Sequence, residues 1–172
     1  MITFSEDKQL NKKTIYLAGG CFWGLQKYFD QFSGVISTEV GYANGPDKAP
    51  TYEEVCNDSG HAETVRIEYD EEVMNLKELL ANYFRVIDPV SVNRQGGDIG
   101  IQYRTGIYYT SDDQLPFIQE VFEAVRNEAG QDLAVVVEPL KNYFPAEEYH
   151  QKYLDKNPGG YCHIPAAFFK NS

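Results

Sequence analysis

The sequence predicts an α/β (α+β) fold, in which a two-layer open sheet has a ferredoxin-like β-α-β-β-α-β core, extra helices and a coiled C-terminal tail. Strand-like and helix-like segments alternate along the chain, and the first six follow that order. The 172 residues, 42% of them apolar, suffice for one hydrophobic core without disulfides or zinc. We therefore expect a single domain over residues 1–172, with an N-terminal extension at 1–13 and a tail at 155–172.

The first part of the chain contains most of this core. Thr14–Ala18 is a β-branched and aromatic run that ends at two glycines, and apolar residues then recur with helical spacing over 22–32. Val35–Tyr42 is typical of a second strand that ends at a turn signal. Ala62–Tyr69 alternates between apolar and polar residues, and a second helical stripe follows over 76–84.

The second part continues the alternation. Arg104–Thr110 is expected to form a strand, and the apolar face over 117–125 indicates a helix. Ala134–Glu138 is expected to be a final buried strand, and Pro145–Leu154 a short helix. The connection Asp88–Tyr103 contains three glycines, and connections of this length in a compact domain are usually functional or disordered. We expect it to be a site loop.

The charge balance excludes several classes of partner. The chain has 15 Lys and Arg and 26 Asp and Glu, a net charge of −11, whereas nucleic acids and anionic membranes are bound through concentrated positive charge. The longest aliphatic run, Leu133–Val137, is far shorter than the ~20 residues that span a bilayer, and residues 1–13 contain no apolar signal segment. We expect a cytoplasmic monomer, because this charge also opposes self-association.

The three cysteines do not indicate a disulfide framework. Cys21, Cys56 and Cys162 are an odd number at wide spacing, which is typical of thiols in a reducing compartment. There is no C-x-x-C or H-x-x-x-H pair, and Cys162 and His163 are adjacent, so we expect no metal site. Cys56 lies in an expected short helix, where we expect it to be buried.

Cys21 is the first candidate for chemistry. It lies between Gly20 and Phe22, where the first strand is followed by the first helix, so its sulfur is expected near unpaired backbone N–H groups. That position lowers a thiol pKa and favours the thiolate. The alternative is a small buried apolar residue, as most free cysteines are. The aromatic residues Phe22 and Trp23 come directly after Cys21. They either pack in the core or form the wall of a pocket for a small apolar group.

Glu63 occupies the apolar face of its strand. It shares that face with Val65, Ile67 and Tyr69, and burial would raise the pKa of its carboxyl and keep it protonated as a general acid. A solvated position at the start of the strand is the alternative. With His61 it spells the H-x-E of zinc deaminases, but their P-C-x-x-C segment is absent, which excludes that site.

Three further candidates have a structural and a chemical interpretation. Cys162 follows a flexible Pro-Gly-Gly segment, which would let its thiol travel to a reactive sulfur as a resolving cysteine does. The alternative is an incidental exposed thiol. His61 and His150 are expected to be structural histidines whose hydrogen bonds are satisfied.

Five short segments stand in order along the chain. They are Gly20-Cys21-Phe22-Trp23-Gly24, Val40-Gly41-Tyr42, Gly60-His61-Ala62-Glu63, Asn93-Arg94-Gln95 followed by Asp98-Ile99-Gly100-Ile101-Gln102-Tyr103-Arg104, and Asn157-Pro158-Gly159-Gly160-Tyr161-Cys162. Together they resemble the motifs of the A-type peptide-methionine sulfoxide reductases, from about Ile15 to Ile164. Five motifs in one order are far more specific than any one of them.

The resemblance implies a reaction. Cys21 would attack the sulfoxide sulfur as a thiolate, Phe22 and Trp23 would enclose the ε-methyl group, and Glu63 would protonate the departing oxygen. The substrate would be the S-epimer of methionine sulfoxide, in oxidised proteins and as the free amino acid, so the activity would repair oxidative damage.

The resemblance also implies supporting roles and a relay. Tyr42 and Tyr103 would hydrogen-bond the departing oxygen, and Asp98 would act through water and orient the substrate. The sulfenic acid left on Cys21 would condense with Cys162, and thioredoxin, or dithiothreitol in vitro, would reduce the disulfide. No metal or organic cofactor is implied.

Two departures from the family's pattern concern the relay and the loop. Cys56 is close to His61, and no cysteine follows Cys162, so one disulfide is expected instead of two. Gly97 and Ile101 replace residues that are more usual in the site loop, which affects the expected substrate preference but not the chemistry.

Two other interpretations are open from the residues alone. Cys21 with His61 or His150 as its base would form the site of a cysteine hydrolase or acyltransferase. Cys21 and Cys162 would form a regulatory disulfide in a redox sensor or binding module. Such a sensor has no use for the acid Glu63 and the two tyrosines.

Overall fold

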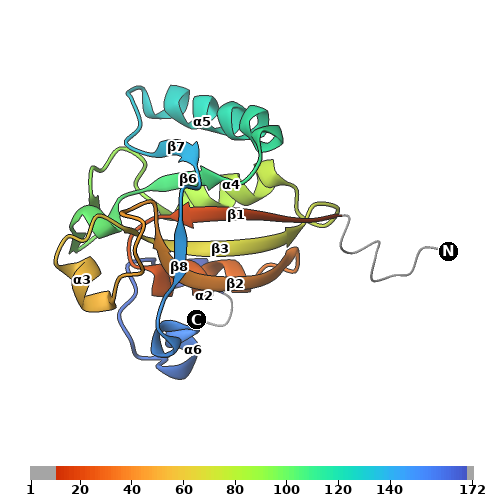
Figure 1. The fold of residues 1–172 in the computed structure, drawn as a ribbon. Helices are drawn as coiled ribbons and strands as arrows, with labels where there is room; N and C mark the ends of the chain where they lie inside the picture. Colours follow the sequence, from red (N-terminus) through yellow and green to blue (C-terminus); the bar gives the residue numbers. More distant parts are fainter. Residues whose placement is uncertain (1–10, 170–172) are drawn as a thin grey trace.

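The computed structural model describes residues 11–169, which contain a six-stranded sheet of order β7-β6-β1-β3-β2-β8 (Figure 1). Its four central strands are β6 (Gly106–Tyr109), β1 (Lys12–Ala18), β3 (Ala62–Asp70) and β2 (Val35–Ala43), each antiparallel to its neighbour. The order β6-β1-β3-β2, with a helix after β1 and after β3, is that of a ferredoxin-like core. The expected fold class is confirmed.

Helices α2 (Phe22–Asp30) and α4 (Leu76–Val86) cover one face of this sheet (Figure 1). Side chains of a strand alternate between its two sides, so every second residue of β1 and β3 joins these helices in the core. The Asn75 side chain accepts a hydrogen bond from the Glu78 N–H and caps the first turn of α4. The fully buried strand residues of this layer include Ile15, Leu17, Val40, Val65 and Ile67.

Strand β1 begins earlier than expected. Its pairing with β3 starts at Lys12 opposite Asp70, and the Lys12 ammonium lies 2.5 Å from the Glu68 carboxylate. Lys12 and Lys13, which were expected in the N-terminal extension, therefore belong to the sheet. Residues 1–10 of that extension and residues 170–172 of the tail lie outside the described residues.

The strand expected at Ala134–Glu138 is β7 (Val136–Pro139), and its expected burial is wrong. It lies parallel to β6 at the edge of the sheet, where Val136 is 39% exposed. An apolar run has the same pattern in a central strand and in an edge strand. Nor is β7 the final strand, because β8 (Tyr143–Pro145) pairs with β2 at the opposite edge.

The helix expected at Pro145–Leu154 is also wrong. Pro145 ends β8, a single 3₁₀ turn follows over Glu148–His150 (η3), and α6 covers only Tyr153–Lys156. Lys152 separates the two with a φ of 56°, in the left-handed region that a continuing helix excludes.

The expected site loop, Asp88–Tyr103, has short elements of its own. The buried Gln95 side chain accepts a hydrogen bond from the Asp88 N–H at 2.7 Å and donates one to the Asp88 carbonyl at 2.8 Å, which closes the loop on itself. The elements not yet named are β4 (Arg94–Gln95), β5 (Asp98–Ile99), η1 (Ile101–Tyr103), α3 (Tyr52–Cys56), η2 (Asp112–Gln114), α5 (Leu115–Ala129) and η4 (Ala166–Phe168).

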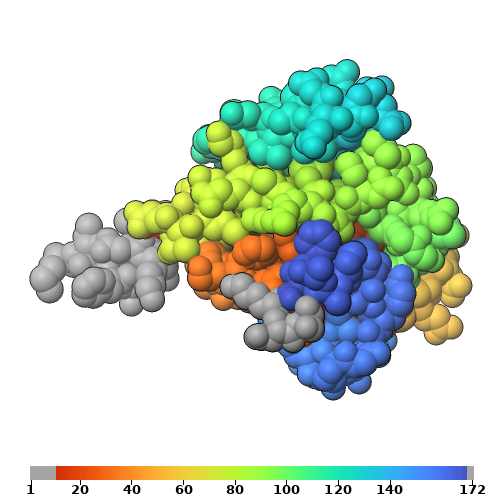
Figure 2. All heavy atoms as spheres, turned by 180° about the vertical axis from the view of Figure 1, so that it is seen from behind, coloured from red at the N-terminus to blue at the C-terminus, as the bar shows by residue number. Residues whose placement is uncertain are grey.

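The C-terminal segment lies across α2 and against the site loop when the molecule is seen from behind (Figure 2). Gln31, at the end of α2, donates a hydrogen bond to the Phe168 carbonyl at 2.8 Å. The tail is therefore packed on the helix that follows Cys21. None of the helices within residues 11–169 combines the length and apolar character needed to cross a bilayer.

Candidate active site

Cys21 lies at the N-terminal end of α2. It caps that helix with extended backbone angles, and it is 7% exposed. The turn before it requires glycine, because Gly20 has a φ of +79° and a Cβ on Gly19 would lie 2.7 Å from Ile87 Cγ2. The expected sequence of strand, tight turn and helix is present, and it places the thiol at the helix end.

The pKa of the Cys21 thiol is raised, although a lowered value was expected. Burial is the largest cause, and the Glu63 and Asp98 carboxyl groups add to it. The Trp23 backbone N–H lowers the pKa, as expected at a helix N-terminus. Desolvation outweighs that effect, so the expected lowering of the Cys21 pKa is wrong.

The Glu63 carboxyl is buried beside the first turn of α2. It is 1% exposed, and its Oε1 accepts a hydrogen bond from the Phe22 backbone N–H at 3.2 Å. Burial raises the pKa of Glu63 to about 8 in spite of that hydrogen bond, with a smaller contribution from Asp98. The buried Oε2 has no hydrogen-bond partner among the described residues. A carboxyl that is neutral at pH 7 and has a free oxygen can act as a proton donor.

Tyr103 and Asp98 approach the same site from the site loop. The Tyr103 carbonyl accepts a hydrogen bond at 3.3 Å from the N–H of the residue before Cys21, which ties the loop to the turn. Burial, followed by Glu63 and Asp98, raises the pKa of the Tyr103 hydroxyl. Burial also raises the pKa of Asp98, while the Tyr161 hydroxyl and the Cys21 N–H oppose that change.

Tyr42 directs its hydroxyl to a carboxylate that the sequence pattern does not indicate. The hydroxyl donates a hydrogen bond to Glu147 Oε1 at 2.7 Å, and Glu147 Oε2 accepts one from the Tyr52 N–H at 2.9 Å. Burial is the largest cause of the raised pKa of Tyr42, and Glu147 adds to it. Tyr42 pairs with Glu63 across β2 and β3, and its ring centroid lies 5.8 Å from that of Phe22.

An aromatic cluster surrounds the two rings that follow Cys21. The Trp23 indole stacks on Tyr153 with centroids 3.7 Å apart, and its Nε1 donates a hydrogen bond to His150 Nδ1 at 3.0 Å. The His150 ring lies 5.3 Å from Phe22, and burial lowers its pKa, so the neutral ring can accept the indole proton. His150 is buried, and its Nε2 has no partner among the described residues, so the expectation that its hydrogen bonds are satisfied is wrong.

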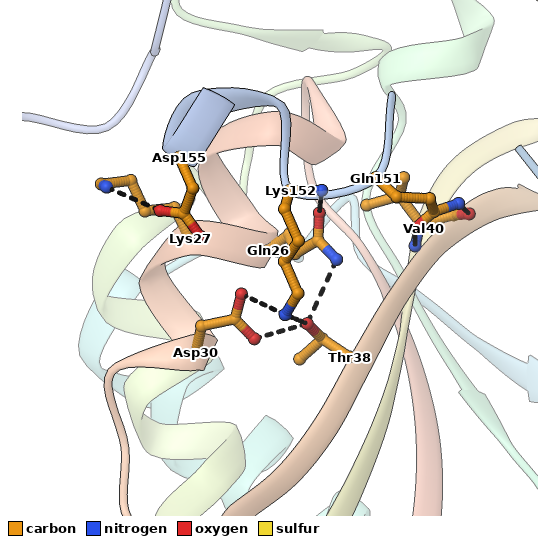
Figure 3. Close-up of polar contacts among 8 residues, drawn as sticks. All are labelled: Gln26, Lys27, Asp30, Thr38, Val40, Gln151, Lys152 and Asp155. Carbon is orange, nitrogen blue, oxygen red and sulfur yellow. Dashed lines mark hydrogen bonds and ion pairs between the residues drawn. The ribbon is translucent and has the colours of Figure 1, made fainter. Parts of the chain in front are cut away.

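The segment 150–155, which carries part of this cluster, is fastened to α2 and β2 (Figure 3). The Lys152 ammonium lies 2.6 Å from the Asp30 carboxylate of α2. The Gln151 side chain exchanges two hydrogen bonds with the backbone of Val40, at 3.0 and 2.9 Å. These contacts join residues more than 100 positions apart and hold the cluster against the helix that begins after Cys21.

Cys162 lies over the first turn of α2. Its Sγ is 2.8 Å from the position that a Cβ on Gly24 would occupy, and it is one of the groups that raise the pKa of Cys21. Its thiol donates a long hydrogen bond of 3.6 Å to the Ile164 carbonyl. The structure thus brings the two thiols to the same end of one helix.

Two other predicted residues are His61 and Cys56, and Glu63 is among the groups that raise the pKa of the Cys56 thiol. His61 is held by the Pro46 carbonyl at Nε2 and by the Ser59 hydroxyl at Nδ1, each at 2.8 Å, as a structural histidine is. Cys56 is exposed, so its expected burial is wrong, and Val55 is the buried residue of that short helix. No cluster of His, Cys, Asp and Glu within residues 11–169 could hold a metal ion.

The sequence pattern gives little sign of Glu147, Tyr52 and Tyr153 as neighbours of the site. They lie on α3 and on the segment after β8, which only long-range contacts bring to Cys21. The one available signal is the density of aromatic rings around His150 in the segment 149–153.

The comparisons with known proteins point to one family. Residues 13–172 match the family model described as peptide methionine sulfoxide reductase. The chain is 56% identical over 161 residues to a protein named peptide methionine sulfoxide reductase MsrA from Lachnoclostridium phytofermentans, which covers 93% of this chain and 97% of that one.

Solved structures show the same likeness. The crystal structure of Mxr1 from Saccharomyces cerevisiae in reduced form is similar with a TM-score of 0.85 and 38% identity, over 91% of this chain and 92% of that one. Mxr1 in complex with Trx2 is similar with a TM-score of 0.60 and 27% identity, over 84% of this chain and 86% of that one.

Proposed function

Because the chain belongs to the peptide methionine sulfoxide reductase family, we propose that its substrate is the S-epimer of methionine sulfoxide, in oxidised proteins and as the free amino acid. The enzyme is an oxidoreductase that reduces methionine sulfoxide to methionine and is recycled by thioredoxin. One observation supports the assignment of roles above all others. It is the buried, neutral carboxyl of Glu63 against the backbone of the residue that follows Cys21.

Cys21 and Glu63 carry the reaction. Glu63, whose pKa is raised to about 8, donates its proton to the sulfoxide oxygen as the Cys21 sulfur attacks the sulfoxide sulfur. The thiol proton of Cys21 passes to the Glu63 carboxylate, which ends protonated as it began. The oxygen moves to the Cys21 sulfur as its bond to the substrate sulfur and the new sulfur–sulfur bond break, so methionine leaves and Cys21 becomes a sulfenic acid. The substrate sulfur gains the two electrons that the Cys21 sulfur loses.

The aromatic residues shape the pocket. Phe22 and Trp23 enclose the ε-methyl group, and the stack on Tyr153 and the hydrogen bond to His150 keep the indole in place. A rigid apolar wall positions the sulfoxide without further ordering when substrate binds.

Two hydroxyls and one carboxyl act on the oxygen and on substrate orientation. Tyr103 hydrogen-bonds the departing oxygen, and Tyr42 does so by exchanging its hydrogen bond to Glu147 for one to the substrate. Asp98 orients the substrate through water. The raised pKa of the Tyr103 hydroxyl, which burial and Glu63 cause, keeps it protonated as a donor.

The sulfenic acid is removed by Cys162. Its thiol condenses with the oxidised Cys21 to form a disulfide, which thioredoxin reduces, and dithiothreitol replaces thioredoxin in vitro. The position of Cys162 over the first turn of α2 supports this pairing. The sequence of steps uses no metal or organic cofactor. The chain acts as a single reductase domain over residues 1–172 and as a cytoplasmic monomer, which a net charge of −11 favours.

The first test is methionine release from the separate S- and R-epimers of a blocked methionine sulfoxide, with dithiothreitol as the reductant. We expect turnover of the S-epimer alone and none in Cys21→Ser. Turnover of the R-epimer, or activity that survives Cys21→Ser, would contradict the proposal. Glu63→Ala should lose turnover while the protein stays folded, and intact turnover would remove Glu63 from the reaction.

A further inference from the structure

His163 is a buried histidine that the reaction described above does not use. Both of its ring nitrogens are buried, the Gly19 backbone approaches the ring, and the ring has no hydrogen bond to another side chain among the described residues. Burial lowers the pKa of His163 to about 4, against the effect of the Gly19 backbone, so the ring is neutral at working pH. A neutral imidazole has one nitrogen with a free lone pair, which can accept a proton.

The ring lies close to both Gly20, the residue before Cys21, and Gly24, in the first turn of α2. A Cβ on Gly20 would lie 2.9 Å from His163 Nε2, and a Cβ on Gly24 would lie 3.6 Å from Nδ1. The same position on Gly24 lies 2.8 Å from Cys162 Sγ. Nδ1 and Sγ therefore border one small space at the first turn of α2, and Nε2 lies beside the residue before Cys21.

The Cys162 thiol needs a base at this point. Only a thiolate attacks an oxidised sulfur efficiently, but burial raises the pKa of Cys162 and Asp98 acts in the same direction. The Ile164 backbone and the Lys27 ammonium oppose these effects without reversing them. In the structure the thiol is a hydrogen-bond donor to Ile164, and thus holds its proton.

Apart from Asp98, whose Oδ2 has no hydrogen-bond partner among the described residues, the other candidate bases near the site are already engaged. His61 uses both ring nitrogens for the structural contacts described above, and His150 Nδ1 accepts the indole proton of Trp23. Glu63 is protonated near neutral pH because burial raises its pKa to about 8. His163 is the neutral base next to Cys162 in the chain and at the first turn of α2.

We propose that His163 accepts the proton of the Cys162 thiol in the step that joins Cys162 to the oxidised Cys21, an inference that rests on the proposed function. The Cys162 sulfur attacks the sulfenic sulfur of Cys21, and the S–S bond forms as the S–O bond breaks. The departing hydroxide takes the proton from His163 and leaves as water. The sulfenic sulfur is reduced and the Cys162 sulfur is oxidised, so no external oxidant or reductant enters, and the imidazole ends neutral.

A single-turnover experiment with His163→Asn and His163→Ala tests this role. Excess enzyme is mixed with the S-epimer without a reductant and quenched with an alkylating agent. Methionine then reports the first step, and the Cys21–Cys162 disulfide, measured by mass, reports the second. In the wild type we expect a disulfide rate that is nearly flat between pH 6 and 8, because His163 is neutral throughout. His61→Asn is the control, and we expect its pH profile to match that of the wild type.

The variants should lack this internal base. At pH 6.5 we expect the disulfide rate, relative to methionine release, to fall at least about tenfold. We also expect that rate to rise about tenfold per pH unit, because it then follows the free thiolate. Added imidazole should restore the rate in His163→Ala.

Several outcomes would overturn the proposal. One is a wild-type disulfide rate that already rises about tenfold per pH unit, a result that needs no variant to fold. Another is slower disulfide formation in the variants, with a rate that stays independent of pH and does not increase with added imidazole. His163 would then only position the tail. Absence of methionine from the wild type would instead show the failure of the proposed function itself.

Discussion

Replacing the buried Glu63 carboxyl by an amide should change how the stability of the protein depends on pH. In Glu63→Gln the amide oxygen can accept the Phe22 N–H, as Oε1 does at 3.2 Å, and the NH₂ group takes the place of the protonated Oε2. The variant keeps the size and the hydrogen bond of the neutral acid but cannot ionise. It therefore measures what ionisation of Glu63 costs the folded protein.

The magnitude follows from the pKa. The folded pKa of about 8 lies above the ordinary value of 4.5, so at intermediate pH the folded protein holds a proton that the unfolded chain has lost. The free energy of unfolding of the wild type then decreases as pH rises. The stabilisation is fully present below the unfolded pKa and lost above the folded one. Between pH 5 and pH 9 the free energy of unfolding of the wild type should fall by about 4 kcal/mol from this cause. Glu63→Gln cannot ionise at this position and should show no such fall.

Urea unfolding of both proteins at several pH values between 5 and 9 measures this difference. Glu68→Gln is the matched control on the same strand. Although desolvation raises the pKa of Glu68, its ion pairs with Lys12 and Arg66 lower it overall, so its stabilisation is lost only in acid. The control should therefore differ from the wild type by a constant amount above pH 5.

Parallel curves for the wild type and Glu63→Gln would refute the reasoning. They would show that Glu63 ionises as freely in the folded protein as in the unfolded chain, and it could not then serve as the general acid at neutral pH. If the reasoning holds, kcat/KM for the sulfoxide should also fall about 10²- to 10⁴-fold in the variant, because an amide has no proton to donate.

Three further predictions concern the relay, the pocket wall and the turn. Cys162→Ser should release one methionine per enzyme with thioredoxin and then stop, and undiminished steady-state turnover would contradict its resolving role. His150→Phe removes the acceptor of the part-buried indole N–H of Trp23, a loss of about 1 kcal/mol, and should raise KM about fivefold with a smaller change in kcat. An unchanged KM would show that substrate binding does not depend on the hydrogen bond between Trp23 and His150. Gly130→Ala, at φ +70° with open space around it, should lose about 1–2 kcal/mol in urea unfolding. Gly20→Ala, at φ +79°, should lose more, because its Cβ would meet a side chain at 2.8 Å, and equal losses would exclude that overlap.

The parts of the fold that the sequence predicts are those decided by local patterns. The alternation over Ala62–Tyr69 locates β3 to within one residue and places Glu63 on its buried face. β7 and β8 depend instead on the strands beside them, and neither an edge position nor a three-residue pairing leaves a pattern of its own. The helix expected from Pro145 fails because Pro145 belongs to β8, Gln151 is extended and Lys152 is left-handed.

In the candidate site, too, local patterns predict some features, and long-range contacts determine the others. Local signals locate Cys21 at a helix start, because glycine before and rings after it leave few other arrangements. The hydrogen bonds of Tyr42 with Glu147 and of Trp23 with His150 join residues more than 100 positions apart, which no local pattern predicts. The pKa of Cys21 was mispredicted for the same reason, since the groups that bury the thiol and oppose its charge come from other elements.

The raised pKa values of Cys21 and Glu63 have a common cause, because two neighbouring buried acids disfavour being charged at the same time. A thiolate and a carboxylate side by side in a buried site would repel each other strongly, so at neutral pH at most one of the two is charged. The reaction meets this constraint if the Glu63 proton moves to the substrate oxygen while the Cys21 sulfur forms its new bond. Neither a full Cys21 thiolate nor a full Glu63 carboxylate then forms, because the charge that develops on each group is neutralised in the same step. The same burial that disfavours a resting thiolate therefore favours proton transfer and attack in a single step.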